Sequence, residues 1–232
     1  MKQVIILAAG KGTRLLPLTK NTPKPLIEIN GKPFLYYFFK NLEQLGFEKV
    51  FLVVNYLKEQ VEAFVNESDF PFEVILVDQK EAKGTGHAVL IVEPFIQGNF
   101  AVINGDNLFS INDLKSLELD DEFSYIYGLE HDHPEKFGVL KTDGEFLTEI
   151  IEKPDAPPTN IINAGLYKFT PEIFKALKNI SLSSRGEYEL PDAIMYLVKQ
   201  GKVKVKTLQD EYVDLGMPKD VSKVEDYVRR NF

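Results

Sequence analysis

The chain has 232 residues, which is enough for one large α/β domain or two small ones with a sizeable core. Its formal net charge of -8 argues against broad binding to nucleic acids or anionic membranes, so a phosphate site would have to be a local cluster of cations. The absence of cysteine excludes disulfides, thiolate nucleophiles and cysteine metal sites, and it fits a cytoplasmic location. The apolar run at residues 4–9 is too short for a signal peptide, and no run in the chain is long enough to span a membrane.

Strands and helices alternate in the first part of the chain. The run Val4 to Ala9 is unbroken, apolar and followed by Gly10, as expected of a strand buried on both faces. By the same reasoning we expect strands at 50–54, 72–77 and 100–103 and helices at 34–45, 58–65 and 86–93. Repeated β-α-β units of this kind predict an α/β fold with a Rossmann-like, mostly parallel sheet flanked by helices.

The pattern changes from about residue 122 onward, where strand-like segments follow one another over short connections. The expected strands are 123–129, 137–141, 146–152, 164–169 and 202–208, and the expected helices are 171–178, 188–199 and 219–230. No internal repeat, low-complexity tract or long linker interrupts the chain. We therefore expect a single domain over 1–232, with a nucleotide-binding half at about 1–120 and a second, β-rich half at about 121–232.

Several polar segments follow the predicted parallel strands. The segment 10–14 follows the first strand, Lys24 lies in the loop that begins there, the segment 79–86 follows the third strand, and Asp106 ends the fourth. In open parallel sheets ligands bind beyond the carboxyl ends of the strands. These segments are therefore expected to converge on one site.

The first loop, Gly10-Lys11-Gly12-Thr13-Arg14, has the composition of a phosphate-binding turn. Glycine lets backbone amides approach phosphate oxygens closely, and Arg14 and Lys24 would supply positive charge. A Gly-x-Gly pattern alone is more often a plain turn. The loop is neither a Walker loop, since Gly-x-x-x-x-Gly-Lys-Ser/Thr is absent, nor a dinucleotide fingerprint, since the third small residue is replaced by Leu15.

The longer N-terminal signature is more specific. Leu-Ala-Ala-Gly-Lys-Gly-Thr-Arg-Leu at 7–15, Pro-Lys-Pro-Leu at 23–26 and Asn-Gly-Lys-Pro at 30–33 closely resemble the sugar-phosphate nucleotidyltransferase family, which includes glucose-1-phosphate thymidylyl- and uridylyltransferases. Further matches to the family occur at 84–88, 104–106, 152–154, 163–165, 187–193 and 214–218. The resemblance implies an enzyme that joins a sugar 1-phosphate, with glucose 1-phosphate expected, to UTP or dTTP and releases pyrophosphate. It also implies Mg²⁺ as cofactor and the nucleotide-diphospho-sugar transferase type of fold, with an added β-rich sugar-binding part.

The resemblance assigns roles to individual residues. Catalysis would depend on Arg14, Lys24 and Asp106, and Mg²⁺ would bind Asp106 and Asp214, a pairing that only the family supplies. The nucleotide would contact Leu7, Ala9, Gly10, Gly12, Thr13, Arg14, Lys24, Gln79, Gly84 and Thr85. The sugar phosphate would contact Gly138, Glu152, Lys153, Asn163 and Gly165. Since an amide both donates and accepts, Gln79 suits the imide edge of uracil or thymine. For Glu187 and Asp192 the sequence leaves open whether they line the site or have a structural role.

The sequence leaves three other functions open. The chain could be a guanylyl- or cytidylyltransferase acting on another phosphorylated small molecule, such as mannose 1-phosphate. It could be a non-catalytic nucleotide-sugar sensor, or part of a bifunctional enzyme, although no hexapeptide-repeat segment is present to support acetyl transfer. The expected partners are the two small-molecule substrates, without nucleic acid or membrane. Self-association into a homo-oligomer stays open, as do the sugar and the choice between UTP and dTTP.

Overall fold

The structure is a computed structural model, and it describes residues 2–117 and 119–232. The chain forms two compact units, and it leaves and re-enters the first one. The first unit holds residues 2–82, 103–116 and 210–232, and the second holds 83–102, 117 and 119–209. These units differ from the expected halves at about 1–120 and 121–232, because the C-terminal segment belongs with the N-terminal one.

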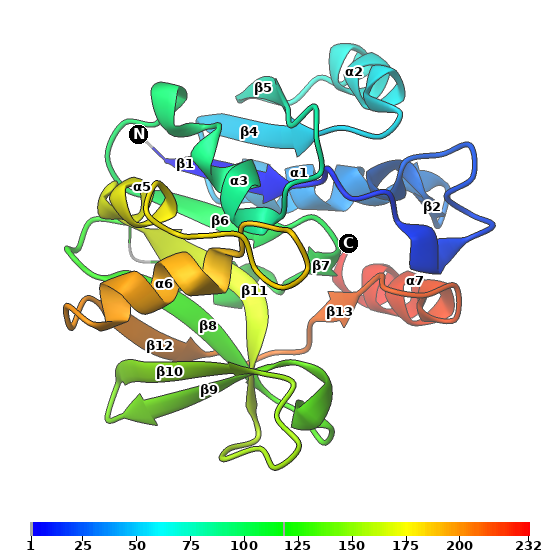
Figure 1. The fold of residues 1–232 in the computed structure, drawn as a ribbon. Helices are drawn as coiled ribbons and strands as arrows, with labels where there is room; N and C mark the ends of the chain where they lie inside the picture. The colour runs from blue at the N-terminus through cyan, green and yellow to red at the C-terminus, as the bar shows by residue number, and fades with distance from the viewer. Residues whose placement is uncertain (1, 118) are drawn as a thin grey trace. The chain divides into compact units, whose positions relative to one another are not determined.

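The first unit contains the parallel sheet that the sequence predicts. Its strands β1 (Gln3–Leu7), β4 (Lys49–Val54) and β5 (Glu73–Asp78) pair in parallel in the order β5-β4-β1. Helices α1 (Phe34–Gln44) and α2 (Lys58–Glu67) connect them (Figure 1). The next strand, β6 (Phe100–Asn104), belongs to both units, with residues 100–102 in the second and 103–104 in the first. The strand positions expected at 4–9, 50–54, 72–77 and 100–103 are confirmed.

Helix α1 shows why the local sequence folds as it does. It begins after Pro33, whose fixed φ suits a helix start, and it ends before Gly46, which adopts a φ of +66°. Its apolar face is buried, with Phe34, Phe38 and Leu42 at most a few per cent exposed. The helix is thereby held by packing against the unit's core rather than by its intrinsic propensity.

Short elements complete the first unit. They are the 3₁₀ turns η1 (Thr13–Leu15) and η2 (Lys24–Leu26), strands β2 (Glu28–Ile29), β3 (Lys32–Pro33), β7 (Asn107–Leu108) and β13 (Val213–Asp214), and helices α4 (Ile111–Lys115) and α7 (Asp220–Asn231). The C-terminal segment joins this unit because β13 pairs with β7 and because the Asn30 side-chain amide donates to the Glu225 carbonyl of α7 at 2.8 Å. Sequence analysis missed β7, β13 and α4, since two-residue strands have no periodicity and form through long-range pairing.

The second unit is built on a mixed sheet. Its strand order is β6-β11-β8-β12-β10-β9, in which β8 and β12 are parallel while β11–β8, β10–β12 and β10–β9 are antiparallel. The strands are β8 (Ser124–Glu130), β9 (Gly138–Asp143), β10 (Phe146–Glu152), β11 (Ile161–Phe169) and β12 (Val203–Thr207). The helices and turns are α3 (Thr85–Leu90), η3 (Glu93–Phe95), η4 (Pro134–Lys136), α5 (Glu172–Leu177) and α6 (Leu190–Val198). The β-rich second part expected from the sequence is confirmed, and the parallel pattern is confined mainly to the first unit.

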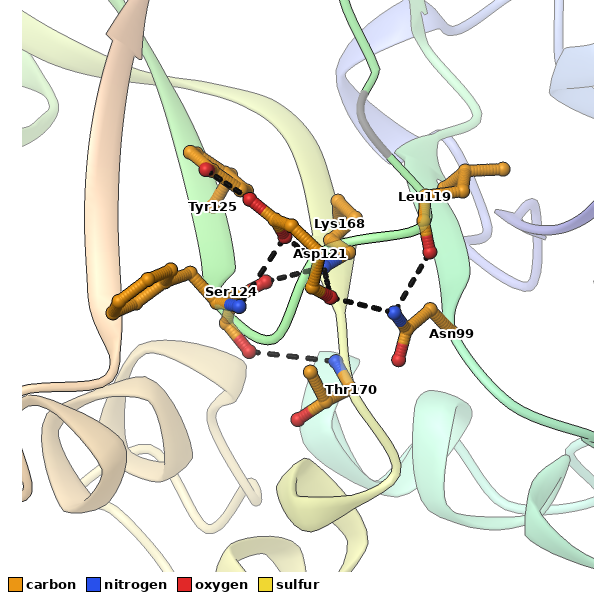
Figure 2. Close-up of polar contacts among 8 residues, drawn as sticks. Asn99, Leu119, Asp121, Ser124, Tyr125, Lys168 and Thr170 are labelled. Carbon is orange, nitrogen blue, oxygen red and sulfur yellow. Dashed lines mark hydrogen bonds and ion pairs between the residues drawn. The ribbon is translucent and has the colours of Figure 1, made fainter.

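A polar cluster lies within the second unit (Figure 2). Lys168 of β11 is 0% exposed, and its ammonium donates to the Asp121 carboxylate at 2.6 Å and to the carbonyl oxygens of Asp121 and Phe123. Tyr125 donates its hydroxyl to the same carboxylate, and the Asn99 side chain donates to the Asp121 carbonyl at 2.8 Å. A buried ammonium needs such partners, because an unpaired charge in the interior is costly. The cluster therefore fixes the segment that leads into β8.

None of the helices in the described part of the chain is both long and apolar enough to span a lipid bilayer.

Candidate active site

The glycine loop forms one wall of a pocket in the first unit. Strand β1 ends at Leu7, and the Ala8 N–H still donates to the Val53 carbonyl at 2.9 Å, which directs the chain off the sheet edge. The pocket has a volume of about 240 Å³. It is lined by Leu7, Ala8, Gly10, Gly12, Thr13, Arg14, Leu15, Lys24, Pro25, Gly105, Asp106 and Gly216. The segments after β1 and β6 therefore meet in this pocket, whereas the segment 79–86, which was expected to converge with them, is not part of its lining.

Lys24 and Asp106 meet in this pocket although they are far apart in sequence. Their Nζ and Oδ2 atoms are 2.8 Å apart. Asp106 is brought there because the Gly105 N–H donates to the Leu7 carbonyl at 2.9 Å, next to the glycine loop. A Cβ at position 105 would lie only 2.6 Å from that carbonyl, so this close approach requires glycine.

Asp214 is placed beside Asp106 by the pairing of β7 with β13. Asp214 faces Asn107 in that pairing, and the Leu215 N–H donates to the Asp106 carbonyl at 2.9 Å. Surrounding protein atoms that displace water, and then the Asp106 carboxylate, raise the pKa of Asp214 to about 6, although part of the side chain stays exposed. The two carboxylates therefore repel each other, and a cation between them would relieve the repulsion.

The two carboxylates have the chemistry of a Mg²⁺ site that is completed by substrate. Mg²⁺ prefers oxygen ligands, keeps several waters and is commonly bound by one or two carboxylates together with substrate phosphates. Among residues 2–117 and 119–232 there is no group of three or more His, Asp or Glu side chains that could hold a metal.

The residues expected to read the base are divided between the two units. Gln79 directly follows β5 in the first unit, where its N–H donates to the Val54 carbonyl at 2.9 Å and the residue is only 6% exposed. Gly84 and Thr85 belong to the second unit, at the N-terminus of α3. The segment 79–86, which the sequence suggested as one loop, is therefore supported from two units.

The motif at 187–193 explains how Gly84 and Thr85 are held. The Tyr188 N–H donates to the Lys83 carbonyl, the Gly86 N–H donates to the Tyr188 carbonyl, both at 2.8 Å, and the Leu190 N–H donates to the Thr85 hydroxyl at 3.1 Å. Gly84 has a φ of +92°, and a Cβ there would lie 2.6 Å from the Tyr188 carbonyl. The motif supports this turn.

The residues expected to bind the sugar phosphate gather in one place within the second unit. Gly138 of β9 faces Glu152 of β10, and a Cβ at Gly138 would lie 3.2 Å from the Glu152 Oε2 and 3.9 Å from the Asn163 Cβ. The Asn163 side chain accepts the Gly165 N–H at 3.1 Å, where β11 bulges and Gly165 has a φ of +78°.

Lys153 follows directly at the end of β10. It adopts a φ of +45°, and its N–H donates to the Phe137 carbonyl at 2.9 Å. Its ammonium lies 3.8 Å from the Glu152 carboxylate, and the two side chains are 59% and 56% exposed. Strong exposure leaves the ammonium accessible to an anionic ligand.

Sequence analysis missed Arg185. Its guanidinium donates twice to the Glu189 carboxylate, at 3.1 and 2.8 Å, and its N–H donates to the Ser183 hydroxyl at 3.2 Å. Burial opposes its charge, but the negative charges of Glu189, Glu187 and Glu152 outweigh burial and raise the pKa of Arg185. Arg185 is thus a cation within electrostatic reach of Glu152. Its position two residues before the matched motif at 187–193 was the available signal.

Comparison with known proteins places this site in a family. Residues 3–231 match the family model described as nucleotidyl transferase, and the chain belongs to this family. The resemblance and the fold class expected from the sequence are therefore confirmed.

Individual relatives cover the chain almost completely. A bifunctional protein GlmU from Methanocaldococcus jannaschii is 41% identical over 229 residues, which is 97% of this chain and 53% of that protein. The UTP–glucose-1-phosphate uridylyltransferase AglF of Haloferax volcanii is 38% identical over 231 residues, covering 96% of this chain and 95% of AglF. A structure of UDP-glucose pyrophosphorylase complexed with UDP-glucose has a TM-score of 0.88 and 25% identity, with 100% of both chains covered. The chain thus spans about half the length of the GlmU relatives and nearly the whole of AglF.

Proposed function

We propose that this protein is a sugar-1-phosphate nucleotidyltransferase, which joins a sugar 1-phosphate to a nucleoside triphosphate and releases pyrophosphate. The observation that carries the proposal is the meeting of Lys24, Asp106 and the glycine loop in one pocket, with Asp214 paired beside it. Cations, a carboxylate pair and a glycine-rich backbone together suit a triphosphate with its metal.

The reaction depends more on neutralising the negative charge of the two substrates than on acid–base catalysis. The oxygen of the sugar phosphate attacks the α-phosphorus in line, and pyrophosphate leaves with the electrons of the broken bond. A phosphate monoester is already ionised at neutral pH, so no general base has to activate it. Positioning of two bound reactants can supply about 7–11 kcal/mol of the barrier.

Each group of residues has a part in this proposal. Arg14 and Lys24 would neutralise the β- and γ-phosphates and the departing pyrophosphate, while Lys153, with Arg185, would hold the sugar phosphate. Asp106 and Asp214 would hold Mg²⁺, which when bound would serve as Lewis acid and template. Glu152, Asn163 and the backbone at Gly138 and Gly165 would hold the sugar itself.

The names of the relatives favour particular substrates. AglF acts on UTP and glucose 1-phosphate by its name, and UDP-glucose is bound in the similar structure. Gln79, whose amide suits the imide edge of a pyrimidine, agrees with UTP or dTTP. We therefore propose UTP or dTTP with glucose 1-phosphate as the first pair to test, in a magnesium-containing buffer. Another phosphorylated sugar, with GTP or CTP, is the alternative.

Pyrophosphate release across a matrix of nucleoside triphosphates and sugar 1-phosphates tests the proposal. We expect turnover that requires both substrates and Mg²⁺, with the highest kcat/KM for a pyrimidine triphosphate. Highest activity with GTP would overturn the pyrimidine assignment while leaving the reaction class intact. Tight binding of an NDP-sugar without turnover of any pair would instead support a sensor.

A further inference from the structure

Thr19 lies behind the glycine loop and outside the pocket wall. It is 2% exposed, and its hydroxyl donates to the Gly12 carbonyl at 2.7 Å. The same carbonyl accepts the Leu15 N–H at 2.9 Å. A carbonyl oxygen has two lone pairs, so these two donors together fix its direction.

Fixing the Gly12 carbonyl also fixes a backbone donor. The peptide between Gly12 and Thr13 is planar, and in a trans peptide the N–H points opposite to the carbonyl. Both Gly12 and Thr13 line the pocket, whereas Thr19 does not. The bond from Thr19 therefore directs the Thr13 N–H away from Thr19.

Further contacts hold the methyl group of Thr19 and the loop that follows it. A Cβ at Gly12, where φ is +63°, would lie 2.8 Å from the Thr19 methyl carbon and 3.4 Å from the Lys24 Cβ, so both side chains lie close to the Gly12 backbone. Farther along the loop, the Tyr56 hydroxyl donates to the Lys20 carbonyl at 2.8 Å and the Gln60 amide donates to the Asn21 carbonyl at 3.0 Å. These bonds connect the loop to α2 and its entry.

We propose that Thr19 is a positioning residue for the triphosphate. It holds the Gly12–Thr13 peptide so that the Thr13 N–H is presented to phosphate oxygens, and it does so without touching the substrate. The inference rests on the proposed function of this pocket. It identifies a hydroxyl, rather than a further cation, as the group that preorganises the loop.

The test compares Thr19→Val, which removes the hydroxyl and keeps the shape, with Thr19→Ser, which keeps the hydroxyl. Thr148→Val is a matched control, because the Thr148 hydroxyl donates to the Lys141 carbonyl at 2.9 Å in the β9–β10 hairpin. For Thr19→Val we expect the KM for the triphosphate, and its Kd by calorimetry without sugar phosphate, to rise about tenfold. The KM for sugar 1-phosphate should stay within about twofold, and Thr19→Ser and Thr148→Val should resemble the wild type.

Several results would overturn the proposal. The first is an unchanged KM and Kd for the triphosphate in folded Thr19→Val. The second is equal impairment of the Val and Ser variants. The third is impairment toward both substrates together with a lower Tm, which would indicate only a structural role for Thr19. If Thr19→Val does not fold, Thr19→Ala carries the same comparison. A wild type that turns over no substrate pair would count against the proposed function, whereas the calorimetric comparison of triphosphate binding would still decide the role of Thr19.

Discussion

Lys24 and Asp106 form the single contact on which the proposed chemistry depends most. In the free protein the ammonium lies 2.8 Å from the carboxylate and neutralises it. When triphosphate and Mg²⁺ bind, both residues gain partners of opposite charge, the ammonium a phosphate and the carboxylate the metal. We therefore expect this ion pair to open on substrate binding.

The first prediction at the residue scale concerns Asp106. Asp106→Asn keeps the shape of the side chain but removes a negative metal ligand, so kcat for pyrophosphate release should fall by about 100-fold or more while the fold survives. The measurement is steady-state kinetics in Mg²⁺ alongside a thermal melt. Asp226→Asn is the control, since the Asp226 carboxylate forms an exposed ion pair with Arg229 on α7. Near-normal turnover of folded Asp106→Asn would remove Asp106 from the metal site.

A second prediction separates the two phosphate sites. Lys153→Ala should raise the KM for sugar 1-phosphate about 10- to 150-fold, because a charge-assisted hydrogen bond is worth about 1.5–3 kcal/mol. Triphosphate affinity, measured by calorimetry without sugar, should change little. Lys24→Ala should show the reverse, with weaker triphosphate binding or lower kcat.

The control for the lysine prediction is another exposed ion pair. Lys178→Ala breaks the 2.6 Å pair with Glu93 and should leave both KM values unchanged, because exposed pairs contribute only about 0–1 kcal/mol, and only to stability. If Lys153→Ala behaves like Lys178→Ala, Glu152 and Lys153 form nothing more than a surface pair.

At the scale of elements, the second unit depends on contacts that hold loops against helices and strands. The turn at Gly84 and Thr85 is held by Tyr188 and Leu190, and the segment before β8 is held by Lys168 of β11. Both arrangements join segments that are far apart in sequence. In both places these long-range hydrogen bonds hold a loop that has no regular hydrogen bonds of a helix or sheet.

The third prediction tests the Lys168 cluster of Figure 2. Lys168→Met keeps the buried volume but leaves the Asp121 carboxylate without its ammonium, which should lower the free energy of unfolding by about 3 kcal/mol. Urea denaturation measures the change. Lys202→Met is the matched control, because Lys202 pairs with Glu172 where both side chains are about 40% exposed, and it should cost at most about 1 kcal/mol. Equal losses in the two variants would show that the buried ammonium has no special role.

The same cluster predicts a dependence on pH. Burial opposes ionisation of Asp121, but hydrogen bonds from Lys168 and Tyr125 outweigh it and lower the pKa of Asp121. The unfolded state therefore takes up this proton at higher pH than the folded state. The stabilisation is complete above the ordinary Asp pKa of about 3.9 and is lost as the pH falls through the lower folded pKa. The stability difference between wild type and Asp121→Asn should shrink in acid, as urea denaturation across pH would show; a constant difference would contradict the assignment.

At the scale of the whole molecule, charge is the relevant property. The chain has a net charge of -8, yet its proposed substrates are polyanions of small size. Arg14 and Lys24 can attract a triphosphate locally, whereas the long-range field repels extended polyanions.

The fifth prediction follows from this contrast. Labelled single- or double-stranded DNA should show no binding by fluorescence anisotropy at about 0.15 M salt, since duplex binding requires several phosphate-contacting cations. A titration with UTP or dTTP in Mg²⁺, under the same conditions, is the positive control. Binding of DNA with a steep salt dependence would show a basic surface that the net charge conceals.

Local composition and short motifs were enough to predict the strands of the first unit, the β-rich second part and the family. Continuous apolar runs such as Val4 to Ala9 specify buried strands through local composition alone. The glycines at 10 and 12, with Arg14 and Lys24, indicated a phosphate loop only through the longer signature at 7–15, 23–26 and 30–33, which resembles the family. These signals lie within short segments of the chain, so they can be recognised without knowing the fold.

Which distant residues meet depends on how the chain folds in space. Asp214 reaches Asp106 because the two-residue strands β7 and β13 pair. The C-terminal segment returns to the first unit for the same kind of reason, since long-range pairing has no periodicity in the sequence. Hydrogen bonds between segments distant in the chain depend on the path of the backbone in space, and for this reason the position of Thr19 behind Gly12 became visible only in the folded chain.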